Sequence, residues 1–231
     1  RGLGPPRLPV VDGLNNLMAD NTKKINVMHI LPGLGVGGME TVLVKMLALF
    51  DRERFVTSVC SLWGKGELSN ELEKAGINVF ICNKANRFDF LRVFRLARLL
   101  KDKKINVVHS YSGVYRDGVL AAKLAGVPVI IHTDQGRFYG RSHFTGFYHK
   151  VLSNCFRDKV IAVSEDLKKY LIDEIKINPA KVIVIPNGVK IENNPDFNKG
   201  NYKEKLGLSK DELIFGIVAR LVPVKNHKLL L

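Results

Sequence analysis

The residues best suited to chemistry in this sequence form a glycine-rich loop, which follows an apolar run at residues 25–31. Gly33, Gly35 and Gly38 fit the spacing G-x-G-x-x-G, and a helical pattern begins directly after them. Glycine lets backbone amides approach a ligand closely, and the N-terminus of a helix carries partial positive charge. The pattern therefore favours a phosphate-binding loop between a strand and a helix, with a tight turn needed only for packing as the alternative.

A dinucleotide site needs an acidic residue at the end of a following strand, where the carboxylate binds the ribose. No Asp or Glu ends the apolar run at residues 55–62. The sequence therefore disfavours a NAD-dependent oxidoreductase.

The net charge of +14 is the outstanding feature of the composition. Such a surplus bears on partners rather than on fold, and it leaves nucleic acid, anionic membrane surfaces and phosphorylated ligands open as partners.

Hydrophobic residues make up 46% of the 231 residues, enough for a sizeable core. Cys60, Cys82 and Cys155 are far apart, which predicts reduced cytosolic thiols rather than disulfides or a zinc site. No apolar run reaches the roughly 18 residues that cross a bilayer.

Apolar runs typical of strands alternate with helical patterns along the chain. Strands are expected at residues 25–31, 55–62, 77–82, 106–109, 127–132, 159–163 and 181–185. Helices are expected at residues 67–75, 88–103, 113–124, 144–156 and 164–175, the last with Ser164 as its N-cap. This alternation predicts an α/β fold with a Rossmann-like, mostly parallel sheet and helices on both faces.

Composition divides the chain into four parts. Residues 1–21 lack a hydrophobic period and are expected to be a leader or remnant; residues 22–189 form the Rossmann-like domain. Residues 190–212 are expected to be a polar linker with a short helix, and residues 213–231 to begin another domain with a strand at 213–219 and a helix from 224. In the first domain, ligands are expected at the carboxyl ends of the strands, where loops 32–38, 110–115, 133–141 and 186–188 converge.

Five short motifs, in this order and at this spacing, resemble glycosyltransferase family 4, the retaining enzymes of the GT-B fold. They are Gly37-Gly38-Met39-Glu40, Val107-Val108-His109-Ser110, VIAVS at 160–164, KVIVIPNGV at 181–189 and GIVARLVPVKN at 216–226. The resemblance covers residues 24–231 and implies the N-terminal, acceptor-side half of a GT-B fold with the very start of the donor-binding domain. Residues 1–231 alone are therefore expected to be inactive.

The resemblance implies a hexosyltransferase that moves a sugar from a nucleotide-sugar donor to a cell-envelope glycan or lipid-linked acceptor with retention of configuration. It implies polysaccharide biosynthesis in the cytoplasm. The net charge of +14 further predicts peripheral attraction to the inner face of the plasma membrane. The nucleotide sugar is a substrate, so no cofactor is expected, and the absence of an Asp-x-Asp pair agrees with metal-independent transfer. The alternative is a non-catalytic nucleotide or nucleic-acid binding α/β module, although nucleic acid is not the expected partner.

Donor-binding residues are assigned by the same resemblance. Gly37 and Gly38 would let the donor diphosphate approach the first helix. Arg220 and Lys225 would hold that diphosphate and stabilise the leaving group, with an ordinary solvated basic turn as the alternative.

Two residues are candidates for the catalytic site. His109 ends a strand and is expected to contact acceptor or sugar, although it is equally typical of a structural histidine. Gln135 replaces the histidine of the family motif T-x-H-G; an amide can hydrogen-bond there but cannot carry a proton. The expected acceptor-binding residues are Tyr111, Ser112, Arg137 and Tyr139, and no residue is expected to bind metal. Asn187 and Gly188 are interpreted as turn residues.

The helix expected at residues 88–103 carries Arg92, Arg95 and Arg98 at helical spacing. A basic amphipathic pattern of this kind is typical of helices that lie on anionic membranes. The alternative is an ordinary surface helix that keeps its arginines in water.

Overall fold

The computed structural model describes residues 17, 19, 23–83, 89, 91–137, 143–188, 202–209, 211–219 and 221–230, with backbone only at 143, 144 and 224. The chain divides into two compact units, Arg1–Gly188 and Val189–Leu231, and each is described by itself.

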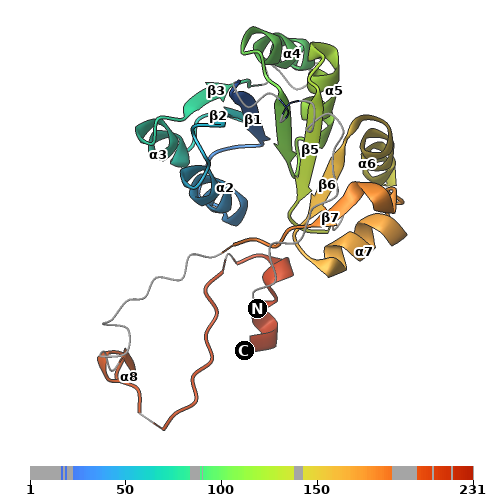
Figure 1. The fold of residues 1–231 in the computed structure, drawn as a ribbon. Helices are drawn as coiled ribbons and strands as arrows, with labels where there is room; N and C mark the ends of the chain where they lie inside the picture. Colours follow the sequence, from blue (N-terminus) through green and yellow to red (C-terminus); the bar gives the residue numbers. More distant parts are fainter. Residues whose placement is uncertain are drawn as a thin grey trace, which may run out of the picture. The chain divides into compact units, whose positions relative to one another are not determined.

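The first unit is built on a sheet of seven parallel strands in the order β3-β2-β1-β4-β5-β6-β7 (Figure 1). The strands are β1 Ile25–Leu31, β2 Phe55–Ser61, β3 Asn78–Ile81, β4 Val107–Tyr111, β5 Val129–Asp134, β6 Lys159–Ala162 and β7 Val182–Val184. The helices are α2 Gly38–Ala48, α3 Leu68–Lys74, α4 Arg92–Asp102, α5 Tyr115–Ala125, α6 His143–Phe156 and α7 Glu165–Asp173, followed by the 3₁₀ turn Pro179–Lys181. The predicted α/β fold class with a Rossmann-like parallel sheet is confirmed.

Helices cover both faces of this sheet. On one face α2 and α3 pack on a core of Leu31, Leu34, Leu43, Leu47, Val59, Leu72, Ile77 and Tyr111. On the other face α4, α5 and α6 pack on a core that includes Met28, Ile30, Leu96, Leu100, Val108, Val119, Ile130 and Leu152. Helix α7 packs through Leu167 and Leu171 on Val160 and Ala162, whose register with β5 places α7 on this second face.

Two polar side chains fix the ends of helices on this second face. Ser164 is the N-cap of α7, as predicted, and its Oγ accepts a hydrogen bond from Leu167 N at 3.1 Å. The ammonium of Lys181 donates to the carbonyl oxygens of Asn154 at 2.7 Å and Arg157 at 2.8 Å, near the end of α6. A cation at this position also interacts favourably with the partial negative charge at the C-terminus of the helix.

Leu17 also belongs to the folded core. It packs against a buried cluster on the sheet that consists of Ile25, Val27, Val107 and Val129. This residue lies in the segment expected to be a leader, so at least one of its side chains contributes to packing.

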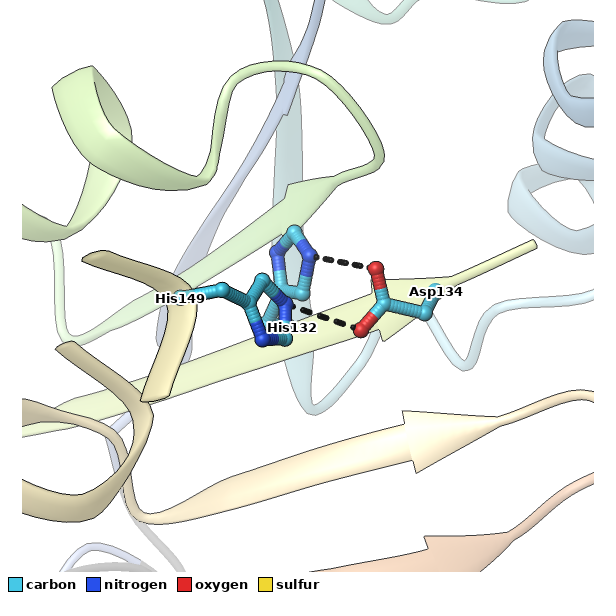
Figure 2. Close-up of side chains that lie close together, drawn as sticks. All are labelled: His132, Asp134 and His149. Atoms are coloured by element: carbon cyan, nitrogen blue, oxygen red, sulfur yellow. Dashed lines mark hydrogen bonds and ion pairs between the residues drawn. The ribbon is translucent and has the colours of Figure 1, made fainter. Parts of the chain in front are cut away.

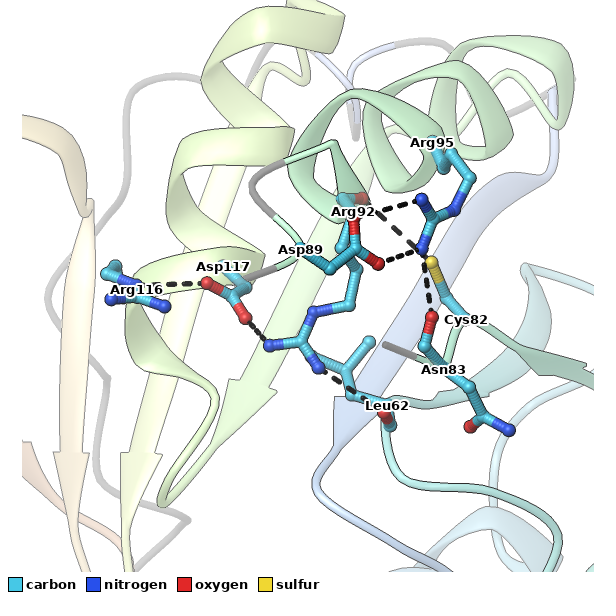
Figure 3. A network of polar contacts seen from close by, with 8 residues as sticks. All are labelled: Leu62, Cys82, Asn83, Asp89, Arg92, Arg95, Arg116 and Asp117. Atoms are coloured by element: carbon cyan, nitrogen blue, oxygen red, sulfur yellow. Dashed lines mark hydrogen bonds and ion pairs between the residues drawn. The ribbon is translucent and has the colours of Figure 1, made fainter. Parts of the chain in front are cut away.

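Arg92 contradicts the basic stripe predicted for α4. It is buried, its Nη2 pairs with Asp117 on α5, and its Nη1 donates to Leu62 O at 3.3 Å (Figure 3). Arg95 pairs with Asp89 and has a side chain that is 44% exposed, and the side chain of Arg98 is 86% exposed. The prediction of a stripe of three exposed arginines is wrong because the first turn of α4 packs against the first turn of α5, where Asp117 supplies the counter-charge.

The second unit contains α8 Tyr202–Lys205, the 3₁₀ helix η2 Pro223–Lys225 and α9 His227–Leu230. Helix α8 is the short helix predicted in the polar segment. The strand predicted at 213–219 is wrong, because none of these residues belongs to a strand and Leu213 and Phe215 are largely exposed. A strand is stable only when a neighbour completes its ladder of hydrogen bonds, and the described part of this unit offers no such neighbour.

Candidate functional site

Three loops at the carboxyl edge of the sheet meet at Gln135. Its backbone N–H donates to Ser112 Oγ, which follows β4, at 3.0 Å. Its side-chain Oε1 accepts from Asn187 Nδ2, which follows β7, at 2.9 Å. We call Ser112, Gln135 and Asn187 the Gln135 cluster; all three remain at least partly accessible to solvent. The structure thus brings together two of the predicted site residues and adds Asn187.

The hydrogen bond from Asn187 decides what Gln135 offers to a ligand. Because Oε1 already accepts from Asn187, the side-chain NH₂ of Gln135 is the group left to interact elsewhere. An amide NH₂ donates hydrogen bonds to hydroxyl or phosphate oxygens and transfers no proton. The sequence predicted that loop 186–188 would converge on the site, but Asn187 itself was interpreted as a turn residue; the hydrogen bond to Gln135 adds this side chain to the site.

His109 is held by other side chains on the face of the sheet that α2 and α3 cover. Its Nε2 lies 2.7 Å from Thr133 Oγ1 and its Nδ1 lies 3.1 Å from the hydroxyl of Tyr111. Burial, reinforced by His29 and His132, places the pKa of His109 well below its ordinary value, so the ring is neutral at pH 7. Both ring nitrogens are engaged, and this geometry favours the structural alternative for His109.

Tyr111 belongs to the same buried row. It is only 4% exposed, and its hydroxyl lies 3.1 Å from His29 Nδ1 as well as from His109 Nδ1. Burial lowers the pKa of His29 to about 3, so this imidazole is also neutral. The row His29, Tyr111, His109 and Thr133 ties β1, β4 and β5 together, and the structure gives no support to acceptor contact by Tyr111.

Arg137 is directed to the start of α7. Its Nη2 and Nε lie 2.6 and 3.2 Å from the two carboxylate oxygens of Asp166, and its guanidinium lies over the ring of Tyr170 at 5.4 Å. A bidentate pair of this kind fixes the plane of the guanidinium. Arg137 therefore borders the Gln135 cluster as a positioned cation, whereas Tyr139 lies outside the described residues.

The glycine-rich loop leaves open space where the helix begins. Gly37 is the N-cap of α2, and a Cβ there would clash with the carboxylate of Glu40. A Cβ on Gly33, Gly35 or Gly38 would meet no heavy atom within 4 Å. Packing therefore requires no glycine at these three positions, and this favours a loop that admits a ligand over a turn needed only for packing.

The basic pair assigned to the donor is only partly described. Lys225 ends the 3₁₀ helix η2 in the second unit and is exposed. Arg220 lies outside the described residues.

A second polar group lies on the opposite face of β5 from Thr133. His132, Asp134 and His149 are fully buried, and they offer ligand atoms within 4.8 Å of one another (Figure 2). Sequence reasoning missed this group, because His149 lies on α6 and reaches the strand only in the folded protein. The signal available in the sequence was the pair His132 and Asp134, two residues apart on one face of an apolar strand.

None of the helices formed by the described residues combines the length and the apolar character needed to cross a membrane.

The sequence profile named Glycosyltransferase Family 4 matches residues 36–193. The chain belongs to glycosyltransferase family 4. That match spans α2, the Gln135 cluster and the whole sheet after β1.

Curated relatives of this family member are glycosyltransferases by name. The UDP-Gal:alpha-D-GlcNAc-diphosphoundecaprenol alpha-1,3-galactosyltransferase of Escherichia coli is 29% identical over 224 residues, which cover 90% of this chain and 57% of that protein. The capsular polysaccharide biosynthesis glycosyltransferase CapH of Staphylococcus aureus is 33% identical over 215 residues, covering 90% of this chain and 56% of that protein. The chain thus spans little more than half the length of these relatives.

Solved structures share the fold. HepE of Anabaena, in a crystal structure with UDP-glucose, superposes with a TM-score of 0.71 at 18% identity, covering 89% of this chain and 56% of HepE. A glycosyltransferase from Rickettsia africae superposes with a TM-score of 0.60 at 21% identity, covering 82% of this chain and 51% of that one. The Rossmann-like half of a GT-B fold is confirmed.

Proposed function

We propose that this chain supplies the acceptor-side half of a retaining hexosyltransferase, which moves a sugar from a nucleotide-sugar donor to a lipid-linked or polymeric glycan. The observation that carries the proposal is the family match over residues 36–193, which contains the open glycine Gly38 and the Gln135 cluster. The names of the Escherichia coli and Staphylococcus aureus relatives support a cell-envelope glycan as acceptor.

The residues of this chain have distinct tasks in the proposed reaction. The N-terminus of α2 and the open space at Gly38 receive the donor diphosphate, where backbone amides and the helix dipole favour negative charge. The NH₂ of Gln135 donates to an oxygen of the bound sugar or acceptor and orients it. Arg220 and Lys225 stabilise the charge that develops on the leaving diphosphate, a role that requires fixed cations rather than a metal ion.

We also propose that α4 attaches the enzyme peripherally to the membrane that holds the acceptor. Leu91 and Phe94 are 67% and 60% exposed at the beginning of this helix, and Arg98 and Lys101 are exposed farther along it. An apolar pair beside cations is suited to the interface of an anionic bilayer. The proposed location is the inner face of the plasma membrane.

A thermal-shift screen on the full-length protein tests the proposed donor. A ligand that binds only the folded state at about 100 times its Kd stabilises by about 2.7 kcal/mol, which raises the midpoint by several degrees. Uridine or guanosine diphosphate sugars are expected to give this shift, and the Gly38→Val variant is expected to lose it. A shift with oligonucleotides and none with any nucleotide sugar would instead support the binding module.

A further inference from the structure

Asp134, the last residue of β5, is fully buried between two imidazoles (Figure 2). Its Oδ1 lies 3.2 Å from His132 Nε2, and its Oδ2 lies 3.1 Å from His149 Nε2. On the far side of the first ring, Ser110 Oγ lies 2.8 Å from His132 Nδ1. A carboxylate only accepts hydrogen bonds, so His132 Nε2 donates to Oδ1, and His132 Nδ1 accepts from the serine hydroxyl.

A buried cation completes the group. Arg157 is 1% exposed, its Nη1 donates to Ser153 Oγ and lies 3.3 Å from His149 Nε2, and its guanidinium lies 5.6 Å from the ring centre of Tyr115. Burial and the charge of Arg157 lower the pKa of His132 to about 4, against the attraction of Asp134. The His132 ring is therefore neutral at pH 7, while Asp134 and Arg157 bring opposite charges to the group. We call Ser110, His132, Asp134, His149 and Arg157 the β5–α6 clasp.

The buried guanidinium of Arg157 argues against a metal ion in the clasp. A divalent cation among His132, Asp134 and His149 would add two positive charges beside the buried guanidinium of Arg157. Oδ1 of Asp134 already accepts a hydrogen bond from His132 Nε2, and Oδ2 lies in a close polar contact with His149 Nε2.

Stability alone also explains the clasp poorly. Taking a carboxylate and a guanidinium out of water costs free energy that their attraction recovers only in part, and well-packed apolar residues often serve as well. The position of the clasp is more informative: Asp134 directly precedes Gln135, whereas His149 lies on α6, the next helix of the chain. The clasp thus ties the strand end that bears Gln135 to β4 and α6, and its Arg157 also contacts Tyr115 on α5.

We propose that the β5–α6 clasp is a positioning device for acceptor binding, with Asp134 as its central positioning residue. It holds the end of β5 so that the Gln135 amide stays bonded to Ser112 and the Gln135 side chain stays within reach of Asn187. This inference rests on the proposed function of the Gln135 cluster.

The test begins with Asp134→Asn in the full-length enzyme. An asparagine offers one acceptor oxygen in place of two, so one imidazole loses its partner and Arg157 loses its counter-charge. The Michaelis constant for the acceptor is expected to rise by about tenfold, which corresponds to the loss of one hydrogen bond to the acceptor. The Michaelis constant for the donor and kcat are expected to change little. Hydrogen exchange at the Gln135 amide is expected to accelerate, and this readout requires no activity.

Asp117→Asn is the matched control. Asp117 is also a buried carboxylate paired with a buried arginine, but it lies in the first turn of α5 with Arg92 as its partner. This variant is expected to lose stability. Hydrogen exchange at the Gln135 amide and the Michaelis constant for the acceptor are expected to stay unchanged. The double variant Asp134→Asn with Arg157→Met removes both buried charges, so it recovers stability but keeps the weak acceptor binding.

Several results would overturn the inference. One is an Asp134→Asn enzyme that binds acceptor like the wild type; another is an equal effect of Asp117→Asn on acceptor binding. Stoichiometric zinc in the purified wild type that is lost in His149→Ala would identify a metal site instead. If the wild type transfers no sugar, the proposed function fails, and exchange at Gln135 still decides whether the clasp positions that residue.

Discussion

Asn187 donates a hydrogen bond from its side chain to Oε1 of Gln135 at 2.9 Å, although 52 positions separate the two residues in the sequence. The contact joins the end of β5 to the residue that follows β7 by three positions. It fixes the orientation of the Gln135 amide, and the second unit begins only two residues farther along the chain. The candidate site is therefore tied to the segment that leads out of the first unit.

Asn187→Asp tests this orientation. The new carboxylate cannot donate, so the Gln135 side chain is expected to turn its NH₂ toward that carboxylate and present its oxygen to the ligand. Acceptor affinity is expected to fall by about fivefold to tenfold, the value of a net hydrogen bond, with unchanged unfolding midpoints. Steady-state kinetics with varied acceptor measures the effect.

Asn178→Asp is the matched control, because Asn178 uses its Oδ1 to accept from Ala180 N at 3.0 Å. A carboxylate makes the same bond, so this variant should behave like the wild type. Equal acceptor affinity in the two variants would mean that Asn187 does not orient Gln135.

Gly38→Val tests the opening at α2. Apart from its chain neighbours and the backbone of its own helix, no protein atom lies within 4 Å of the added Cβ, so the free energy of unfolding is expected to change by less than about 1 kcal/mol. Donor binding and transfer are expected to be lost, because the branched side chain fills the space that the diphosphate enters. Calorimetry with the nucleotide sugar and a transfer assay measure these effects.

Gly118→Val, the same change in the core, provides the opposite pattern. Its Cβ would lie 3.2 Å from Ser110 Cβ and 3.7 Å from Ile30 Cδ1, so the branched side chain overpacks the core and stability is expected to fall while donor affinity is kept. Unchanged turnover in Gly38→Val would show that the loop is only a turn.

Stability is expected to depend on pH through the buried histidines. Burial lowers the pKa of His29 to about 3 and of His132 to about 4, both below the ordinary value of 6.5. As pH falls below 6.5 the unfolded chain takes up protons that the folded chain refuses, so stability is complete above pH 6.5 and is lost progressively toward pH 4. Each such histidine contributes a slope of about 1.4 kcal/mol per pH unit.

Urea unfolding between pH 7.5 and 5 measures this slope. The His29→Asn variant removes one titrating group. Its stability is therefore expected to depend less steeply on pH, by up to about 1.4 kcal/mol per pH unit. A free energy of unfolding that stays constant over this range would contradict the assignment of neutral, buried imidazoles.

Binding to vesicles tests the surface of α4. Partition onto anionic vesicles is expected to weaken as salt rises, since the Debye length is about 8 Å at physiological ionic strength. Phe94→Ser and Arg98→Gln are each expected to reduce binding, because both side chains are exposed. Arg92→Gln is expected to lower stability, since Asp117 loses its buried cation and keeps only the largely exposed Arg116 as a partner. Equal binding to neutral and anionic vesicles would exclude this attachment.

Local patterns in the sequence were sufficient to predict the sheet. Apolar runs identified each strand of the first unit, and Ser164 was identified as a cap because that role depends only on neighbours within one turn. The prediction at 213–219 was wrong because a strand also depends on a partner, which no local pattern provides.

Local patterns could not predict the contacts between residues that lie far apart in the sequence. Arg92 had the spacing of a surface residue, but it is buried in an ion pair with Asp117, which lies 25 positions away in the sequence. Tyr111 looked like a crevice residue by analogy, whereas His29, 82 positions away, holds its hydroxyl in the core. Gln135 was singled out by the family motif that it departs from, and its meeting with Ser112 was predictable because both loops follow parallel strands, whose ends must lie at one edge.

Transfer of a labelled hexose by the full-length protein tests the central claim most directly. The protein would be incubated with a uridine diphosphate hexose and a lipid diphosphate-linked glycan, with and without a chelator of divalent metals. We expect label to appear on the acceptor in both reactions, and the new linkage to keep the anomeric configuration of the donor. A folded protein that transfers label from neither uridine nor guanosine diphosphate sugars, but binds oligonucleotides, would contradict the account.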